Sequence, residues 1–271
     1  MLFKKLHWTL KRHPFLYLTR FRLLSKNCSI VDIENYTYNI HNPKTEIPKV
    51  FYEINSIIFE NFESNGGELD KIKQLCIWLR KHIKGGPGLS LPSEKALRYM
   101  LEQKGGVCSD LVQLFNNFCV INEIQVREWG VTRAPFDSVF GGHSFNEVYI
   151  SELNKWVLLD VSKCLLFFIE NNDKPLSVIE LFQALRQKAK LNFKSFYITK
   201  EYSIESVQKN YLNSGTTPFL VCNYKNKTYD TLLNITRPFC PVIIPHFLLY
   251  MFGKSYYYCF PLDDYKTIFK K

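Results

Sequence analysis

The sequence predicts an α+β protein in which helices pack on an antiparallel sheet. Apolar residues recur at helical spacing over residues 45–62 and 68–83. Further along the chain, apolar and polar residues alternate over 124–133, 143–150 and 155–162, as they do in strands with one buried face. Because the last two of these segments are joined by only a few polar residues, we expect them to pair as antiparallel neighbours.

The helical segments precede the strands. In segment 68–83, Cys76 lies on the apolar stripe, so we expect this thiol to be buried. A third, shorter helix is expected over 93–103, with Ser93 as a candidate N-cap because it follows Pro92. We therefore expect a helical layer that leads up to Cys108.

Residues 104–163 contain the side chains best suited to chemistry, beginning with Cys108. This cysteine follows Gly105 and Gly106 and starts an apolar helix. Unpaired N–H groups and a partial positive charge at a helix N-terminus favour the thiolate, which is the nucleophilic form of cysteine. Cys108 is thus a candidate nucleophile, although a lone cysteine is most often a small buried apolar residue.

His143 begins one strand and Asp160 ends the next, with the polar turn 151–154 between them. A four-residue loop would place Asp160 opposite Phe145 and diagonal to His143, whereas a two-residue loop would place it directly opposite His143. Both registers put the carboxylate and the imidazole on one face of the sheet. A loop with an odd number of residues would separate them.

The order of these three residues and the motifs around them, G-G-V-C, H-S-F-N-E-V-Y and W-V-L-L-D, resemble the transglutaminase-like superfamily. Its core is related to that of the papain-like cysteine peptidases. The resemblance covers about residues 65–165. It implies that Cys108 is the nucleophile, that His143 takes and returns its proton, and that Asp160 orients His143. Val161 departs from the family, where proline often follows the aspartate.

The resemblance leaves the oxyanion donor open. Gln103, five residues before Cys108, is a weak side-chain candidate, and we favour the backbone N–H of Cys108. Trp129 and Trp156 would either line a substrate cleft or pack in the core, and we favour the core. Glu147 shares a strand face with His143 and is interpreted as structural.

Eight cysteines are scattered along the chain without a C-x-x-C pair. This scatter is typical of reduced thiols in a cytoplasmic protein rather than of a disulfide scaffold. No cysteine and histidine residues have metal-ligand spacing, so we expect neither a metal site nor a cofactor.

The net charge of +10 is concentrated in an amphipathic arm, residues 1–30. Seven basic residues and no acidic residue precede Asp32, so the rest of the chain carries only about +3. Residues 1–27 therefore suggest either a peripheral contact at the inner membrane face or a helix packed on the body with a solvated basic face. We expect no nucleic-acid partner, because the folded part lacks the charge of a general binder.

We divide the remainder into a catalytic core, 31–165, and a C-terminal α/β extension, 166–271, that packs on the core. The extension is expected to contain a helix at 175–191 and short strands within 193–236. Segment 238–253 is the most apolar, but its prolines oppose a membrane span, so we expect buried core or a partner contact.

The sequence therefore predicts a cysteine enzyme that cleaves or transfers a peptide or protein amide through a thioester. We favour hydrolysis over cross-linking, because no segment indicates a site for an attacking amine. The alternative is a non-catalytic binding or scaffold protein on the same fold. A third possibility, action on glycopeptides or in surface-polymer assembly at a membrane, rests only on the basic arm.

Overall fold

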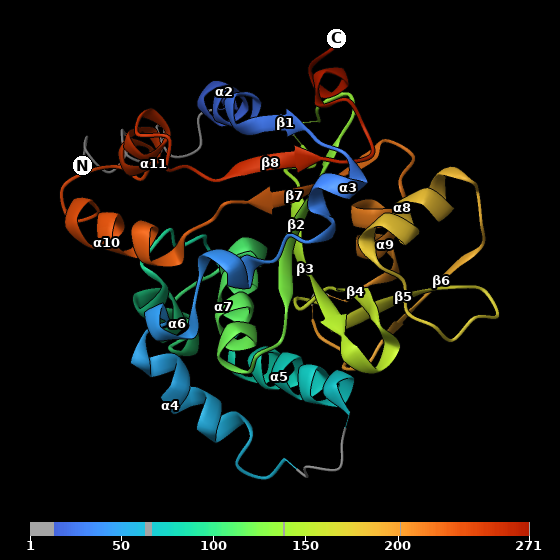
Figure 1. Cartoon of the computed structure of the whole chain (residues 1–271), viewed down its shortest axis with the longest axis horizontal. Coiled ribbons are helices and arrows are strands. Elements are labelled where there is room, and N and C mark those ends of the chain that lie inside the picture. The colour runs from blue at the N-terminus through green and yellow to red at the C-terminus, as the bar shows by residue number, and fades with distance from the viewer. Residues whose placement is uncertain (1–13, 63–66, 138, 201, 271) are drawn as a thin grey trace.

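The computed structural model describes residues 14–62, 67–137, 139–200 and 202–270 and shows the predicted α+β class. A six-stranded sheet runs through the molecule in the order β1-β8-β7-β2-β3-β4 (Figure 1). Its neighbours are antiparallel except for the parallel pair β1 and β8. The strands are β1 (Ser25–Asn27), β2 (Val126–Arg133), β3 (His143–Ile150), β4 (Lys155–Leu159), β7 (Thr216–Cys222) and β8 (Tyr257–Phe260).

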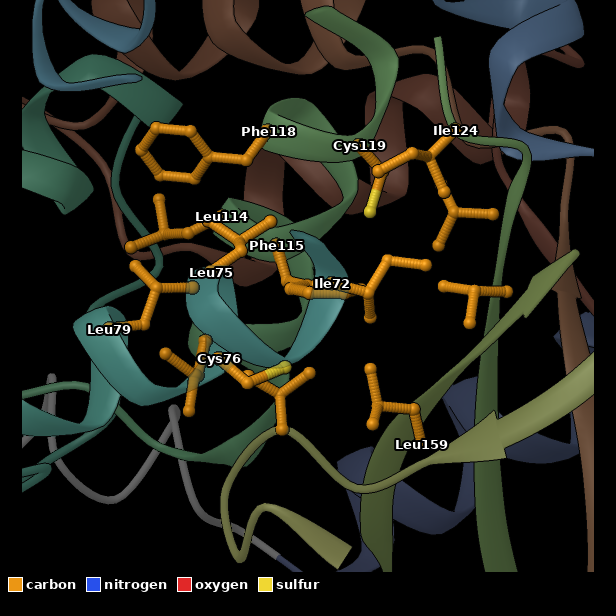
Figure 2. Packing of buried hydrophobic residues seen from close by; sticks show 14 of the residues in the cluster. Ile72, Leu75, Cys76, Leu79, Leu114, Phe115, Phe118, Cys119, Ile124 and Leu159 are labelled. Carbon is orange, nitrogen blue, oxygen red and sulfur yellow. The ribbon is translucent and has the colours of Figure 1, made fainter. Parts of the chain in front are cut away.

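The predicted helical layer is present, and its apolar residues form the largest core cluster. Figure 2 shows side chains of two of these helices interleaved with residues such as Ile124 and Leu159. Ser93 is the first residue of its helix rather than the cap, which is Pro92. The helices are α4 (Lys49–Ile58), α5 (Glu68–His82), α6 (Ser93–Leu101) and α7 (Cys108–Ile121), of which α7 contacts β2 and β3.

A second antiparallel sheet pairs β5 (Leu165–Ile169) with β6 (Leu191–Ser195). Helix α8 (Val178–Arg186) lies between these strands in the chain, inside the helix predicted over 175–191. The side chains of this region bury a second core cluster that includes Trp129 and Tyr211.

The register of β3 and β4 decides between the two predicted loops. Ile150 pairs with Lys155 and Asn146 pairs with Leu159, so four residues connect the strands. Asn154, the last residue of this connection, has a left-handed conformation with φ 49°. Continuing the register places Asp160 opposite Phe145, as the four-residue alternative predicts.

The main sheet crosses both of the expected domain boundaries, near residues 30 and 165. Strand β1 comes from the arm, and β7 and β8 come from the C-terminal part of the chain. These segments therefore complete the sheet that holds the catalytic candidates.

The expectation of strands up to residue 236 is wrong for its last part. Helix α10 (Asn226–Thr236) occupies this segment and buries Tyr229 and Leu233, which lie four residues apart on one helical face. The following apolar segment forms α11 (Ile243–Met251), which buries Pro245 and Leu249 and leaves Phe247 and Met251 exposed.

Shorter elements complete the described chain. The remaining α-helices are α2 (Pro14–Leu24), α3 (Ile30–Glu34) and α9 (Ile204–Val207), and Gln208–Leu212 form a π-helical turn. Single 3-10 turns occupy Tyr38–His41, Lys44–Glu46, Ser151–Leu153 and Tyr265–Phe269.

The expectation that every thiol is reduced is wrong for two residues. Cys28 and Cys259 form a disulfide with a Cα–Cα distance of 5.7 Å. They are 231 positions apart, and the parallel pairing of β1 with β8 brings them together. The sequence spacing of the cysteines contains no trace of this pairing. The free thiols are Cys76, Cys108, Cys119, Cys164, Cys222 and Cys240.

The first part of the predicted arm, residues 1–13, lies outside the described residues. In the described part, Phe21 and Leu24 pack in a third core cluster with residues of β7 and β8. No helix among the described residues is long and apolar enough to cross a membrane. The membrane contact of residues 1–27 stays a prediction. A cytoplasmic location also stays a prediction. It is based on reduced cysteines, and Cys28 and Cys259 form a disulfide.

Candidate active site

Cys108 is the first residue of α7, as predicted, and two glycines allow the tight turn that leads into it. A Cβ on Gly106, whose φ is +114°, would lie 2.6 Å from Met100 Cε. A Cβ on Gly105, whose φ is +136°, would lie 2.7 Å from the carbonyl oxygen of Pro87. Only glycine combines these conformations with such close neighbours.

Asp110 stabilises the start of the helix. Its Oδ2 accepts hydrogen bonds from the backbone N–H groups of Val107 (3.0 Å) and Leu89 (3.1 Å). The backbone N–H of Cys108 donates no hydrogen bond to a described residue. It is therefore free to donate to an oxyanion.

His143 and Asp160 meet as the strand geometry predicts. The imidazole Nε2 lies 2.8 Å from Asp160 Oδ2, and both side chains are buried. On its other side, the His143 ring is hydrogen-bonded to the thiol of Cys108. Since Asp160 occupies Nε2, Nδ1 is the ring nitrogen left for the sulfur. The structure thus brings all three predicted residues together.

Asp160 is surrounded by donors that sequence reasoning missed. Tyr211 donates its hydroxyl to Oδ2 at 2.8 Å, and Lys163 Nζ lies 3.3 Å from the same oxygen. Ser162 donates both its backbone N–H (2.9 Å) and its hydroxyl (2.6 Å) to Oδ1. Ser162 and Lys163 follow Asp160 closely in the chain, so a turn after the strand could have indicated them. Tyr211 is brought in only by tertiary structure.

The same groups set the ionisation of the imidazole and carboxyl. Burial alone would raise the pKa of Asp160, but the charges of Lys163 and His143 hold it well below its usual range. Burial alone would lower the pKa of His143, and Lys163 lowers it too. The Asp160 carboxylate, together with the hydrogen bond to Cys108, outweighs both and raises the pKa of His143 to about 9.

The protonated ring of His143 lowers the pKa of the Cys108 thiol. Burial favours the neutral thiol of Cys108, yet the hydrogen bond and charge of His143, aided by the backbone of Ser144, lower its pKa below the ordinary value. A lowered thiol pKa beside a raised imidazole pKa favours a thiolate–imidazolium pair at neutral pH.

A cavity of about 520 Å³ opens beside Cys108 and His143. Its lining comes from α6, α7, β2 and β3 and also from α2, β7, α10, α11 and β8, so the C-terminal part of the chain shapes the space next to the sulfur. Among the residues that line it are Glu128, Tyr224, Tyr229, Asp230 and His246.

Other sequence candidates lie elsewhere. Gln103 donates its side-chain amide to the carbonyl of His82 and is absent from the cavity lining, so it is not positioned as an oxyanion donor. Trp129 is fully buried, and its indole N–H donates to Glu147 at 3.0 Å. Trp156 lies under the guanidinium of Arg127 at 3.8 Å.

Glu147 also binds Arg127 and the backbone N–H of Val178 (2.8 Å). These contacts support the structural interpretation of this glutamate, and neither tryptophan lines the cavity.

Part of the chain matches a known protein family. Residues 58–161 match the model of the transglutaminase-like superfamily, so this part of the chain is a transglutaminase-like core, as the motifs imply. The match includes the segment from Cys108 to Asp160.

Among solved structures, the chain is similar to one titled "Putative Cysteine Protease from Cytophaga hutchinsonii". The two share 16% sequence identity over 73% of this chain and 68% of the other, with a TM-score of 0.36, which is too low to support a shared function. No curated protein matches the chain.

Proposed function

We propose that the protein is a cysteine-dependent acyl-transfer enzyme whose catalytic residues are Cys108, His143 and Asp160. The observation that carries this proposal is the buried 2.8 Å contact of His143 with Asp160 beside a helix-terminal thiol of lowered pKa. An inert core cysteine has a raised pKa instead, as burial produces at Cys76 and Cys119.

In the first half-reaction, the Cys108 thiolate attacks the carbonyl carbon of an amide. A C–S bond forms and the carbonyl electron pair moves to oxygen, where the backbone N–H of Cys108 stabilises the charge. The His143 imidazolium gives its proton to the amide nitrogen, the C–N bond breaks, and the amine leaves a thioester behind.

In the second half-reaction, neutral His143 removes a proton from water, which attacks the thioester carbonyl. The C–S bond breaks, the acid product leaves, and the thiolate–imidazolium pair is restored. Asp160 holds the ring and stabilises its positive charge throughout. It need not be protonated at any step.

We favour this hydrolytic course, a peptidase or amidase, over cross-linking. No segment of the sequence indicates a site for an attacking amine, whereas the attack of water requires no such site. The substrate we propose is a peptide or protein amide.

The second candidate, a non-catalytic scaffold, makes a different prediction for thiol reactivity. Two described free thiols, Cys108 and Cys240, are partly exposed, whereas the other four are buried. Cys240 therefore serves as an internal control for Cys108. We expect iodoacetamide at pH 6 to modify Cys108 at least ~10-fold faster than Cys240, because the hydrogen bond and charge of His143 favour the Cys108 thiolate.

The measurement is the alkylation rate of each cysteine, read by mass spectrometry of its peptide. His143→Ala should reduce the rate at Cys108 to that at Cys240 and leave Cys240 unchanged. Equal rates in the unmodified protein would support the scaffold. Turnover of a peptide-amide panel that disappears in Cys108→Ala would then establish the enzyme.

A further inference from the structure

Glu128, on β2, is a buried acid in the cavity wall that the mechanism does not use. The residue is 7% exposed, and its Oε2 accepts hydrogen bonds from the side-chain amides of Gln113 and Asn116. Its other oxygen, Oε1, accepts no hydrogen bond from any described residue. No described lysine, arginine or histidine lies within ion-pair distance of this carboxyl group. One oxygen of a buried acid is thus left for a ligand.

Asp230, on α10, is a second acid that lines the same cavity. It accepts hydrogen bonds from the backbone N–H (2.7 Å) and hydroxyl of Ser93 and from the amide of Asn226 (3.2 Å). These donors are neutral, and none of the described basic side chains forms an ion pair with it. The charges of Glu128 and Asp230 both act on the hydroxyl of Tyr224, so the two acids belong to one region of the cavity.

The positive groups that line the cavity do not pair with these two acids, and the His143 imidazolium pairs with Asp160. The charge of Arg20 acts on Tyr229 and His246, and it is not among the influences on Glu128 or Asp230. Glu128 is instead influenced by the charge of Cys108. The acidic region therefore adjoins the nucleophile, and no described cationic side chain forms an ion pair with either acid.

Burial without a cation is unfavourable for a carboxylate. It raises the pKa of Glu128 to about 8 and also raises the pKa of Asp230, against the hydrogen bonds that lower both. A ligand cation would replace the missing partner and favour the charged form of the acids. The rings of Tyr224, Tyr229 and Tyr256 line the same cavity and pack against one another.

We propose that this region of the cavity binds a basic group of the substrate, an ammonium or a guanidinium, next to the amide that Cys108 attacks. The inference rests on the proposed acyl transfer and names its substrate class: amides that carry a lysine-like or arginine-like side chain beside the cleaved bond. Glu128 is the specificity-determining residue, and Asp230 supports it. The cavity volume of about 520 Å³ accommodates such a side chain.

The kinetic test uses fluorogenic peptide amides that are identical except for lysine, norleucine or glutamate next to the cleaved bond. Norleucine matches the lysine stem without its charge. We expect kcat/KM to be at least tenfold higher for lysine than for norleucine, and lowest for glutamate. Glu128→Gln should bring the lysine-to-norleucine ratio close to one, and Asp230→Asn should lower it.

Glu123→Gln is the matched control, because Glu123 is an exposed acid paired with Lys44 (2.6 Å), and neither residue lines the cavity. It should leave the ratio unchanged. A ratio near one in the unsubstituted protein, or a ratio that survives both cavity substitutions, would overturn the proposal.

A binding test that needs no turnover separates this proposal from the enzymatic one. Agmatine, which carries both an ammonium and a guanidinium group, should bind the Cys108→Ser protein in calorimetry, and Glu128→Gln in that background should weaken it at least tenfold. Such binding without hydrolysis of any amide would uphold the cation site and reject acyl transfer. Hydrolysis without lysine preference and without agmatine binding would uphold acyl transfer and reject the cation site.

Discussion

Lys163 opposes Asp160 in setting the charge of His143. It is 4% exposed, and its Nζ lies 3.4 Å from His143 Nε2 and 3.3 Å from Asp160 Oδ2. The ammonium repels an imidazolium but keeps the carboxylate ionised. The buried position of Lys163 thus links the charges of the two proposed catalytic partners.

Lys163→Met should raise the pKa of His143 above its value of about 9, because the substitution removes the positive charge that lowers it. The imidazolium loses its proton as the pH rises through this pKa. The alkaline limb of the His143 ring titration, followed by NMR, should therefore move to higher pH. Asp160 keeps its bonds to Tyr211 and Ser162 in this variant.

Lys155→Met is the control for this change, since Lys155 pairs at the surface with Glu180 (2.7 Å). It should leave the titration of His143 in place. A limb that stays fixed or moves to lower pH in Lys163→Met would show that Lys163 does not act on the ring as described.

At the scale of the element, the turn before α7 requires glycine both for its backbone conformation and for lack of space, as a comparison of Gly106 with Gly141 shows. Gly106 has a φ of +114°, and a Cβ there would lie 2.6 Å from Met100 Cε. Gly141 has a φ of +68°, and a Cβ there would meet nothing within 4 Å. Strain and steric clash therefore combine at Gly106, and strain acts alone at Gly141.

Gly106→Ala should lower the free energy of unfolding by about 2–5 kcal/mol, from backbone strain and overpacking together. Gly141→Ala should cost about 1 kcal/mol, from the left-handed conformation alone. Urea unfolding of both variants measures the difference. Equal losses would mean that the contact with Met100 contributes nothing.

In the hairpin of β3 and β4, side-chain periodicity is sufficient to predict which residues share a face of the sheet. The alternation of apolar residues and the even length of turn 151–154 are enough to predict that Asp160 lies on the face of His143. Composition was misleading for α10. The Tyr, Phe and Thr content of residues 193–236 indicated short strands, whereas the spacing of Tyr229 and Leu233, four residues apart, is the helical signal that the fold follows.

At the scale of the whole molecule, the two ends of the chain close the edge of the main sheet. Strand β1 lies beside β8, the backbone N–H of Cys28 donates to the carbonyl of Phe260 (3.2 Å), and the disulfide to Cys259 joins them covalently. This edge adjoins α2, whose Phe21 lines the cavity. The disulfide therefore ties one wall of the candidate site to the sheet.

Replacing both Cys28 and Cys259 with serine should lower the free energy of unfolding by about 2–5 kcal/mol, because the unfolded chain loses a crosslink that closes a long loop. Urea unfolding with and without a reducing agent measures the effect. Reduction should destabilise the unsubstituted protein and leave the double variant unchanged. Cys240→Ser is the control, since Cys240 is a free thiol, and its stability should still depend on the reducing agent.

The sequence by itself determined the α+β class, the helix that begins at Cys108 and the pairing of His143 with Asp160. These follow from patterns within short segments, where side-chain period, glycines and loop length act directly on local structure. Only the tertiary structure decided the contacts of Tyr211 with Asp160, of Cys28 with Cys259, and the shared cavity of Glu128 and Asp230. Tyr211 and Asp160 are 51 positions apart in the sequence, and Cys28 and Cys259 are 231 positions apart. Their meeting depends on which strands become neighbours in the sheet, and no local period encodes that order.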